Sequence, residues 1–526
     1  MKLSILAVAA FALASEASNS ATQEVDLTAL TRLRDEGLHR SKVMETAQYL
    51  CDVIGPRLTA SPAAKRANEW TRDRFAAWGL VEAHLESWGP FAPGWTLEHS
   101  SLHMLTPTTT PLVAWPKAWS PGTNGVVHAK AMRVDLNSEA DLAAQKGKLK
   151  GRILLLSEAK PVLDEDKPPL TRFSDKDLAE LGQFEIPEQR KLDEEREKDL
   201  KHIRFERARR AFLAEEGVVA AVAASSWQGV VRAQSTGGWH VGESRGVPEF
   251  VLMREQYNRL VRLVEGGTDV DLEAELRVHF DDKDMPGYTT LAEIPGSDKK
   301  DEYVLAGAHL DSWHGGTGAT DNAAGVAAVM EAARILNASG LTPRRTIRFA
   351  LWTGEEQTYG SSSAYVSQHL ASRAAPKDKD EAELDYELQK DPAPLELKPE
   401  HAKLSAYFNI DNGTGRIRGI YAQENSAVAP IFEAWMKPLA DLGVTQLSLR
   451  PEGETDHEPF DQVGIPAFQF IQDDVEYSTR TWHSNLDVYD RLKRDDLVQA
   501  SVVLASFLYD AAMRDERLPR KPLSRR

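Results

Sequence analysis

The sequence predicts an α/β protein with two or three domains, and three observations lead to this prediction. With 526 residues, the chain is too long for one ordinary hydrophobic core. Between residues 303 and 363, short apolar runs typical of buried strands alternate with helix-like segments. Residues 125–282 interrupt this alternation with strand-like runs of their own, which indicates an inserted β-rich domain.

The N-terminus resembles a secretory signal peptide. Lys2 precedes an apolar run over residues 3–14, and the small side chains of Ala12 and Ala14 suit cleavage. The run is too short to span a bilayer comfortably, so we favour a cleaved signal over a membrane anchor. No later stretch reaches transmembrane length in this reading. We therefore expect an exported protein, periplasmic or secreted, without a membrane span.

Local patterns predict the elements before and within the insertion. Helical spacing covers residues 27–54 and 63–79, and strand-like alternation covers residues 81–88. Residues 208–216 are expected to form a helix. Inside the insertion we also expect buried strands at residues 150–156, 217–222, 247–252 and 272–280.

Two runs rich in charge stand apart from these elements. Residues 163–202 are interpreted as a solvated helix or loop rather than a partner-binding tail. Residues 374–403 are interpreted as a surface excursion that can serve as a lid. The basic end of the chain, residues 517–526, is expected to be frayed.

Composition excludes several classes of function. The net charge of −17 provides no basic stripe for phosphates, so we expect neither a nucleic-acid partner nor binding to an anionic membrane. Cys51 is the only cysteine, which rules out an internal disulfide. Its neighbours are apolar, as around a small buried side chain, and a cysteine nucleophile is not expected.

Side chains that commonly bind metals stand where apolar runs end. His309 follows the run 303–308, and the pair Glu355-Glu356 follows the run 346–352. Asp321 comes after a glycine-rich turn and directly before a helix-like segment. Ligand sites in open α/β sheets lie outside the carboxyl ends of the strands, so we expect these side chains to meet at one edge.

Two more candidates complete the set: Asp411 ends the run 404–410, and His483 lies in the polar stretch 481–487. Each residue alone has a simpler explanation, such as a helix N-cap for Asp321. Together they provide two imidazoles and three carboxylates, which suit zinc, with manganese or cobalt as substitutes. Five ligands exceed what one catalytic zinc takes. We therefore expect two zinc ions per chain that share one bridging carboxylate and hold a water between them.

The carboxylates and aspartates beside these ligands have expected roles as well. In an extended segment the side chains of Glu355 and Glu356 would diverge, so one should bind metal and the other should act as general base. Asp311 and Asp487 are close in sequence to the two histidines, and we expect them to orient the imidazole rings.

Three motifs stand out: Gly307–Trp313 (GAHLDSW), Gly318–Gly325 (GATDNAAG) and Leu351–Gln357 (LWTGEEQ). They resemble motifs of the co-catalytic zinc exopeptidases, the family of bacterial leucine aminopeptidases and glutamate carboxypeptidases, and are most similar to the plasma glutamate carboxypeptidases. The resemblance is strong over residues 287–370 and looser over 406–415 and 453–492. It is weak before residue 125, although Arg57 lies in a segment similar to the family's N-terminal segment.

For the site, the resemblance implies that His309 and Asp411 bind one zinc and that Glu356 and His483 bind the other. Asp321 would bridge the two ions, and Glu355 would be the general base.

The resemblance also implies a three-layer α/β/α domain with a mixed sheet and an insertion similar to protease-associated domains. The chain is then divided into five parts: a signal peptide (1–22), the N-terminal part of the catalytic domain (23–124), the inserted domain (125–282), the main catalytic part (283–516) and a basic tail (517–526).

Three residues depart from the family pattern or add to it. Trp482 stands where many relatives have Tyr before the last histidine ligand, so this position offers no phenol to the oxyanion, although an indole N–H can still donate. His314 stands where some relatives have an acid, and we favour a surface turn histidine. His457 lies in a segment similar to a family loop near the substrate, so it is a candidate substrate contact.

The function expected is that of an exopeptidase that hydrolyses terminal bonds of peptides or dipeptides through a zinc-bridging water, and an aminopeptidase or dipeptidase is favoured. The alternatives are a carboxypeptidase of the glutamate-carboxypeptidase type, a one-zinc transferase similar to glutaminyl cyclases, and an inactive binding protein on the same fold. Only a peptide partner is implied, and a homodimer is left open.

Overall fold

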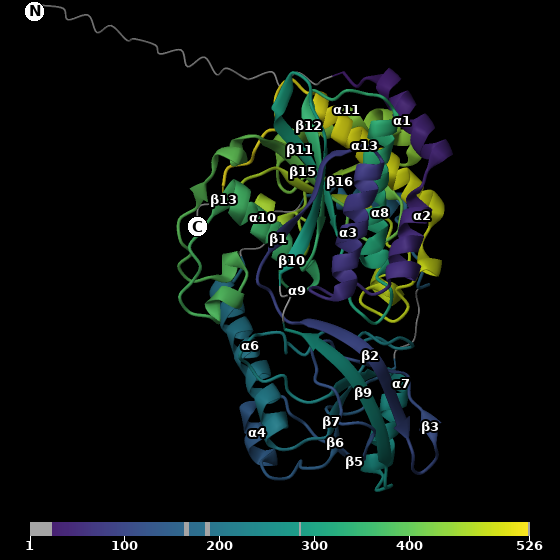
Figure 1. Cartoon of the computed structure of the whole chain (residues 1–526), viewed down its shortest axis with the longest axis vertical. Coiled ribbons are helices and arrows are strands. Elements are labelled where there is room, and N and C mark those ends of the chain that lie inside the picture. Colours follow the sequence, from purple (N-terminus) through teal and green to yellow (C-terminus); the bar gives the residue numbers. More distant parts are fainter. Residues whose placement is uncertain (1–23, 163–167, 185–189, 283–285, 524–526) are drawn as a thin grey trace, which may run out of the picture.

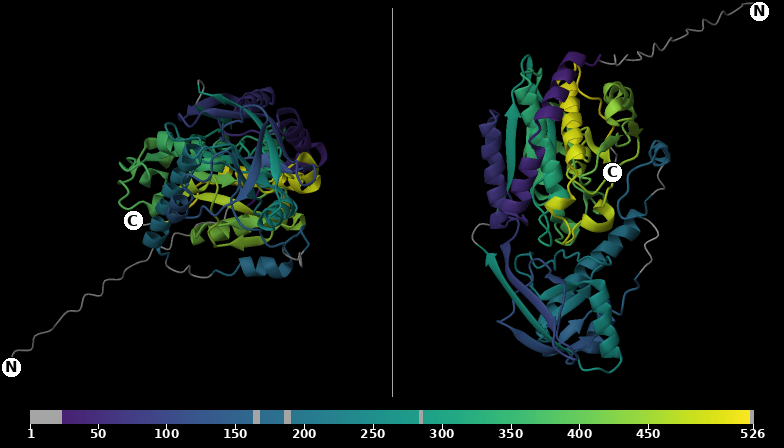
Figure 2. Two further views of the ribbon diagram at one scale, coloured as in Figure 1. Left: turned by 90° about the horizontal axis from the view of Figure 1, so that it is seen from below. Right: turned by 90° about the vertical axis from the view of Figure 1, so that its right-hand side faces the viewer.

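The computed structural model describes residues 24–162, 168–184, 190–282 and 286–523, so the predicted signal peptide lies outside the described residues. Most described strands belong to two eight-stranded sheets, and one further pair, β13 (Ala371–Ser372) and β14 (Glu396–Leu397), stands apart. The two large sheets lie at opposite ends of the long axis of the molecule (Figures 1 and 2). The predicted α/β class is confirmed.

The first sheet is mixed, as the family resemblance implied. Its four central strands run parallel and its outer strands include antiparallel pairs. Buried central strands need apolar side chains on both faces, which explains why they appear in the sequence as continuous apolar runs. Across the sheet the strands follow in the order β1 (Val81–Trp88), β10 (Gly287–Ile294), β12 (Arg345–Trp352), β11 (Lys299–His309), β15 (Leu404–Asn409), β18 (Ala467–Gln472), β16 (Ile417–Tyr421) and β17 (Gln446–Ser448).

Side chains of β11 alternate between two cores, one on each face of this sheet. Val304 and Ala306 belong to the larger core, whereas Tyr303 and Leu305 belong to the smaller one. The result is a helix–sheet–helix arrangement of three layers. The larger core includes α1 (Leu27–Arg40), α2 (Val43–Gln48), α3 (Pro62–Ala77), α8 (Ala324–Ala338), α11 (Ala429–Met436) and α13 (Arg494–Met513), and the smaller includes α10 (Gly360–Tyr365) and α12 (Glu458–Asp461).

Helix α13 is the one described helix that is long and apolar enough to cross a membrane, by length and composition alone. The sequence predicts no such stretch after the N-terminus. However, 94% of the helix's apolar window is buried, and the helix packs against α8 and α1. It has the burial of a core helix in a globular protein.

The second sheet contains the four strands predicted for the insertion, now bounded as β6, β7, β8 and β9. It also includes three strands that lie before residue 125, so the strand-rich block begins earlier than the sequence predicted. Two of these earlier strands find their partners far along the chain, β2 in β9 and β4 in β8, and such distant pairing leaves no local pattern in the sequence. Across the sheet the order is β3 (Thr110–Pro111), β2 (Gly94–Met104), β9 (Asp271–Asp281), β5 (Val127–Arg133), β6 (Ile153–Leu155), β7 (Ala220–Ala224), β8 (Glu249–Leu252) and β4 (Ala114–Pro116).

Helices of this second block are α4 (Glu139–Gln145), α6 (Leu192–Glu215) and α7 (Arg254–Glu265), whereas α5 (Asp175–Leu181) packs against β17 of the first sheet. Helix α6 begins inside the charged run 163–202, which was expected to be solvated. Only part of that expectation holds, because Leu200 on this helix is buried against Leu384 and Leu388 of the second charged run.

Candidate metal centre

The five predicted ligands lie together at the carboxyl edge of the first sheet, as the strand ends predicted. Each is carried by a loop or turn that follows a strand or precedes a helix. They are His309 at the end of β11, Asp321 in the helical turn Ala319–Ala323 before α8, Glu356 in α9 (Glu355–Thr358) after β12, Asp411 just after β15, and His483 just after the turn Tyr477–Thr481.

Asp321 lies between the two imidazoles. Its Oδ1 is 3.1 Å from His309 Nε2, and its Oδ2 is 3.1 Å from His483 Nε2. A second carboxylate accompanies each ring: Asp411 Oδ1 lies 3.3 Å from His309 Nε2, and Glu356 Oε2 lies 2.9 Å from His483 Nε2. The site is therefore two histidine–carboxylate pairs joined by one shared aspartate.

Glu355 and Glu356 sit on a helical turn instead of the extended segment considered from the sequence. Adjacent residues on a helix still diverge, by about 100°. Glu355 faces the pair formed by His309 and Asp411, with one donor atom from each of the three within 4.8 Å of the others, and Glu356 faces His309 and Asp321 in the same manner.

The buried groups of the site influence one another strongly. Burial, and after it the charges of Asp411 and Asp456, raise the pKa of Glu355 well above its usual range. Burial and the neighbouring Asp321 raise the pKa of Glu356 to about 7. Burial alone would lower the pKa of His483, but Glu356 and Asp321 raise it to about 9. Excess negative charge in a buried site calls for a cation.

Unpaired oxygens support the same conclusion. Among the described residues, no donor in hydrogen-bonding geometry reaches the buried atoms Asp321 Oδ2 and Glu356 Oε1. Buried carboxylate oxygens are normally satisfied by hydrogen bonds or by metal ions. Imidazole nitrogens and carboxylate oxygens are also the donor set that zinc accepts. The residues present thus fit divalent metal ions of this kind.

The two aspartates expected to orient the imidazoles differ in what they contact. Asp311 lies beside His309: its backbone oxygen is 3.1 Å from His309 Nδ1, and its carboxylate accepts a hydrogen bond from Thr59. Asp487 instead accepts hydrogen bonds from the backbone and hydroxyl of Thr320 and from the backbone N–H of Asp321. Asp487 therefore fixes the loop that carries Asp321, and it makes no hydrogen bond to His483.

The two other histidines considered in the sequence analysis, His457 and His314, have structural contacts instead. His457 is buried and its Nε2 lies 2.7 Å from the carbonyl oxygen of Glu452, outside the lining of the cleft described below. His314 was expected on the surface, and that expectation is wrong. It is buried, donates to the carbonyl oxygen of Pro116 at 2.7 Å and packs edge-on against Trp95. Both partners come from the strand-rich block, which the local sequence around His314 does not reveal.

Arg57 is a structural contributor that the sequence reading noted only for its family likeness. It is fully buried, and its guanidinium donates to five backbone oxygens, of Leu50, Gly55, Leu310, Thr317 and Gly318. Three of these acceptors lie on the loop between His309 and Asp321. Gly318 has a φ of +60°, and a Cβ there would lie 2.8 Å from the Arg57 Nη2. Arg57 and the glycine together fix the approach to the shared aspartate.

A cleft of about 800 Å³ opens over the metal-binding candidates. Its floor includes Asp321, Glu355, Glu356, Asp411 and His483, together with the side chain of Trp482. Its outer wall comes from three separate parts of the chain: Ile203 of α6, the Trp239-His240 pair, and residues 382–386. The cleft has the size and concave shape of a small-ligand site.

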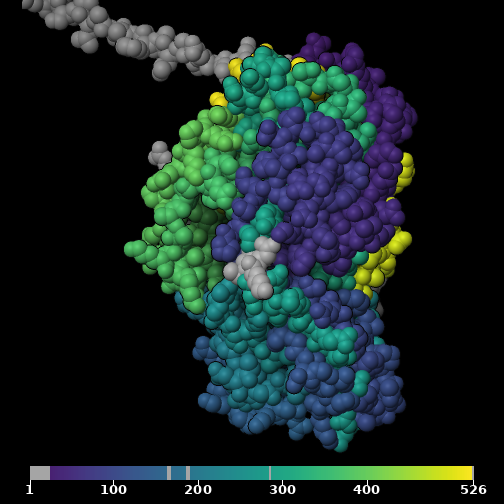
Figure 3. Space-filling model, in the orientation of Figure 1, coloured from purple at the N-terminus to yellow at the C-terminus, as the bar shows by residue number. Residues whose placement is uncertain are grey.

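Helix α6 and residues 378–388 hold each other across this wall, and we call their contact the clasp. Arg207 pairs with Asp380 at 2.7 Å and with Glu383 at 2.8 Å, and Arg204 also pairs with Asp380 at 2.7 Å. Leu200, Leu384 and Leu388 form an apolar cluster beneath these ion pairs. In the space-filling view, the green segment around residue 380 lies above the blue-teal block that includes α6 (Figure 3).

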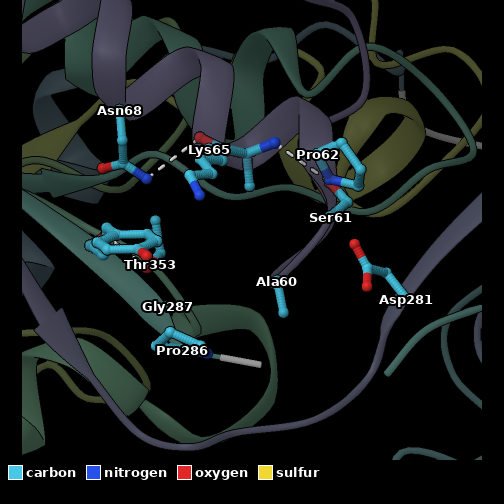
Figure 4. Close-up of a pocket in the computed structure, with 11 residues that line it drawn as sticks. Ala60, Ser61, Pro62, Lys65, Asn68, Asp281, Pro286, Gly287 and Thr353 are labelled. Carbon is cyan, nitrogen blue, oxygen red and sulfur yellow. Dashed lines mark hydrogen bonds between the residues drawn. The ribbon is translucent and has the colours of Figure 1, made fainter. Parts of the chain in front are cut away.

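A separate cavity of about 90 Å³ lies beside the start of α3 (Figure 4). Its hydrogen bonds are structural: Ser61 caps α3 by accepting from the backbone of Ala64, and Asn68 donates to the carbonyl oxygen of Ala64. None of the five predicted ligands lines it.

Comparisons with known proteins agree with the site. Residues 289–508 match the model of peptidase family M28. Carboxypeptidase Q of Mus musculus is 26% identical over 94% of this chain and 90% of its own length. Aminopeptidase YwaD of Bacillus subtilis is 28% identical over 42% of this chain and 44% of its own length.

Solved structures agree in fold. A peptidase M28 precursor from Shewanella amazonensis is 24% identical with a TM-score of 0.65, and the alignment covers 94% of this chain and 98% of that one. A zinc aminopeptidase from Bacillus subtilis is 18% identical with a TM-score of 0.56, covering 92% and 98%. The residues matched by the family model include all five predicted ligands, and together with the sequence relatives they support a metallopeptidase that is similar to peptidase family M28 and to the co-catalytic zinc exopeptidases.

Proposed function

We propose that the protein is an exported exopeptidase that cleaves the terminal bond of peptides or dipeptides and uses two zinc ions, for which manganese or cobalt can substitute. His309 and Asp411 would hold one ion, Glu356 and His483 the other, and Asp321 both. The observation that carries this assignment is the position of Asp321, whose two oxygens each lie 3.1 Å from a different imidazole. That arrangement suits a shared ligand of two metals.

When bound, zinc supplies Lewis acidity that polarises the scissile carbonyl and lowers the pKa of water. Glu355 is proposed as the general base, since it is the carboxylate of the floor left over once the ligands are assigned. Burial raises its pKa well above the ordinary range, and a raised pKa suits a group that both takes and returns a proton near neutral pH. It would take a proton from the attacking water and pass it to the leaving amine.

The charge of the cleft supports preference for a free N-terminus. Beyond the floor, its lining includes Glu383, Asp385, Glu452 and Glu454. Among the described residues that line it, no lysine or arginine is present to bind a terminal carboxylate. A lining of one sign attracts a substrate group of the opposite sign, here an amine. The favoured activity is therefore that of an aminopeptidase or dipeptidase.

A carboxypeptidase is the second candidate, because the sequence similarity to carboxypeptidase Q extends over 94% of this chain. A one-zinc transferase or an inactive binding protein is less well supported, since all five candidate ligands are present and close together. We also propose that the inserted domain expected at residues 125–282, which the second sheet extends to include β2, β3 and β4, is similar to protease-associated domains. Residues 1–22 are proposed as a signal peptide that exports the protein.

The test is zinc content per chain, measured together with hydrolysis of a dipeptide in free and N-acetylated form. Two zinc ions with cleavage of only the free form are expected. Cleavage of the acetylated form with two zinc ions would shift the assignment to a carboxypeptidase. One zinc or none would contradict the five-ligand assignment, and full zinc loading without hydrolysis of a broad peptide panel would support an inactive binding protein.

A further inference from the structure

A short segment of the strand-rich block lies directly against the loop that carries His483. The segment, residues 231–234, belongs to the connection between β7 and β8. The backbone N–H of Asn485 donates to the oxygen of Val231 at 2.9 Å, and the N–H of Val231 donates to the Asn485 side chain at 2.8 Å. Arg232 and Ser484 also form an antiparallel bridge. These backbone contacts lie within two residues of His483, so they fix its position.

From this segment, the side-chain amide nitrogen of Gln234, Nε2, lies 2.9 Å from His483 Nδ1. The other ring nitrogen, Nε2, faces Asp321 and Glu356 at 3.1 and 2.9 Å. One nitrogen of the ring thus faces the carboxylates, and the other faces the strand-rich block. Gln234 lies 249 positions earlier in the chain than the histidine it contacts.

The direction of this hydrogen bond follows from the chemistry of a metal ligand. If Nε2 gives its lone pair to a metal, the proton of the neutral ring is on Nδ1, which then needs an acceptor. The oxygen and nitrogen of a glutamine amide exchange places by a half turn about the last side-chain bond. Gln234 can therefore present its Oε1 to Nδ1–H of His483.

The first histidine provides a comparison within the same site. His309 Nδ1 lies 3.1 Å from the backbone oxygen of Asp311, two residues away in the same motif. That acceptor is local and independent of side-chain identity. His483 has no such backbone acceptor among the hydrogen bonds of the described residues, and its only Nδ1 partner there is Gln234.

The surroundings of His483 fix the plane of its ring as well. The Trp482 ring lies 4.2 Å from the His483 ring, and the Arg232 guanidinium lies 4.5 Å from Trp482 and 4.2 Å from Trp227. His483 itself has a φ of +57°, a left-handed conformation that is strained for a non-glycine residue and persists where neighbours hold it. The contacts from residues 231–234 supply that support.

We propose that Gln234 is a positioning residue: it accepts the Nδ1–H hydrogen bond of His483 and so keeps Nε2 free for the metal shared with Glu356 and Asp321. The proposal rests on the function proposed above. It makes the strand-rich block part of the metal centre as well as a wall of the cleft. Hydrogen-bond partners of metal-binding imidazoles typically change metal affinity by about 10- to 100-fold.

The test compares zinc affinities of Gln234→Leu, which cannot accept a hydrogen bond, and Gln234→Glu, which can only accept. Gln145→Leu in α4, distant from the cleft, is the matched control. Stepwise zinc binding is measured by competition with a chelator. Because Gln234 is exposed, we expect the lower end of the range: Gln234→Leu weakens one of the two zinc ions about tenfold and leaves the other within about twofold. Gln234→Glu and the control retain the affinity of the unmodified protein.

If both zinc ions bind to Gln234→Leu as tightly as to the unmodified protein, the proposed role of Gln234 is overturned while the proposed function stays intact. Failure of the unmodified protein to bind two zinc ions would overturn both. If Gln234→Leu does not fold, as judged by circular dichroism, Gln234→Met replaces it with the same expectation. A weakened Gln234→Glu variant would also contradict the proposal, because a carboxylate is the stronger acceptor.

Discussion

The floor and the outer wall of the cleft are built in different ways. The floor consists of loops at the ends of neighbouring strands, and its contacts are buried, as with Arg57 and the carbonyl oxygens around it. The wall consists of α6 and residues 378–388, joined by partly exposed ion pairs of the clasp. Buried polar contacts are costly to break, whereas exposed ion pairs contribute little each. We expect the floor to determine chemistry, metal binding and stability, and the wall to determine substrate access.

The largest effect is expected at the floor. Glu355→Ala removes the proposed base without removing a proposed ligand, so kcat should fall by about 10²- to 10⁴-fold while two zinc ions remain bound. Steady-state kinetics and zinc content on the same preparation measure this. Substantial residual turnover, or loss of zinc, would place Glu355 among the ligands instead.

Metal affinity should depend steeply on pH. Without metal, the pKa of Glu356 is raised to about 7 and that of His483 to about 9, and both must be deprotonated to bind zinc. For the ion held by Glu356 and His483, lower pH therefore weakens binding: about tenfold per pH unit between 9 and 7, where one proton is displaced, and about 100-fold per unit below 7, where two are displaced. Chelator competition from pH 6 to 9 measures the slope. A flat profile would show that these groups do not bind the metal.

Arg57→Lys tests the support beneath the floor. Lysine has three donors at one point and cannot satisfy five carbonyl oxygens, so buried acceptors remain unpaired at about 1–3 kcal/mol each. We expect the free energy of unfolding to fall by about 3 kcal/mol in urea denaturation. Arg66→Lys, on the exposed side of α3, should leave stability unchanged. A change of less than about 1 kcal/mol in Arg57→Lys would contradict the structural role of this network.

The smallest effect is expected at the wall. Arg207→Met removes the ion pairs to Asp380 and Glu383, and also the one to Glu243, and we expect KM to rise about threefold while kcat and zinc content stay unchanged. High salt should raise KM of the unmodified protein in the same direction by screening the clasp. Arg209→Met is the control, since among the described residues the ion pair of Arg209 lies within α6, with Glu206. A fall in kcat instead of a rise in KM would mean that the wall affects the chemical step as well as substrate access.

The sequence predicted the floor better than the wall for a physical reason. Each ligand follows an apolar run, and parallel strands bring their carboxyl ends to one edge, so a local pattern carries the information for His309 and Asp411. The contact of Gln234 with His483, and the placement of β2 beside β9, join distant segments by packing alone. Such contacts leave no periodic pattern in the sequence. The buried position of His314 could not be predicted for the same reason, because its contacts come from distant segments.

Cys51 gives the buried segment beneath the floor a useful chemical property. It is the only cysteine, it is buried, and burial raises the pKa of its thiol to about 12. The residue before it, Leu50, provides one of the carbonyl oxygens bound by Arg57. Thiol reagents attack only the exposed thiolate, so native-state labelling of Cys51 must await local unfolding of this segment. The labelling rate of Cys51 therefore reports how often the segment that supports the metal centre unfolds locally, and its measurement needs no introduced probe.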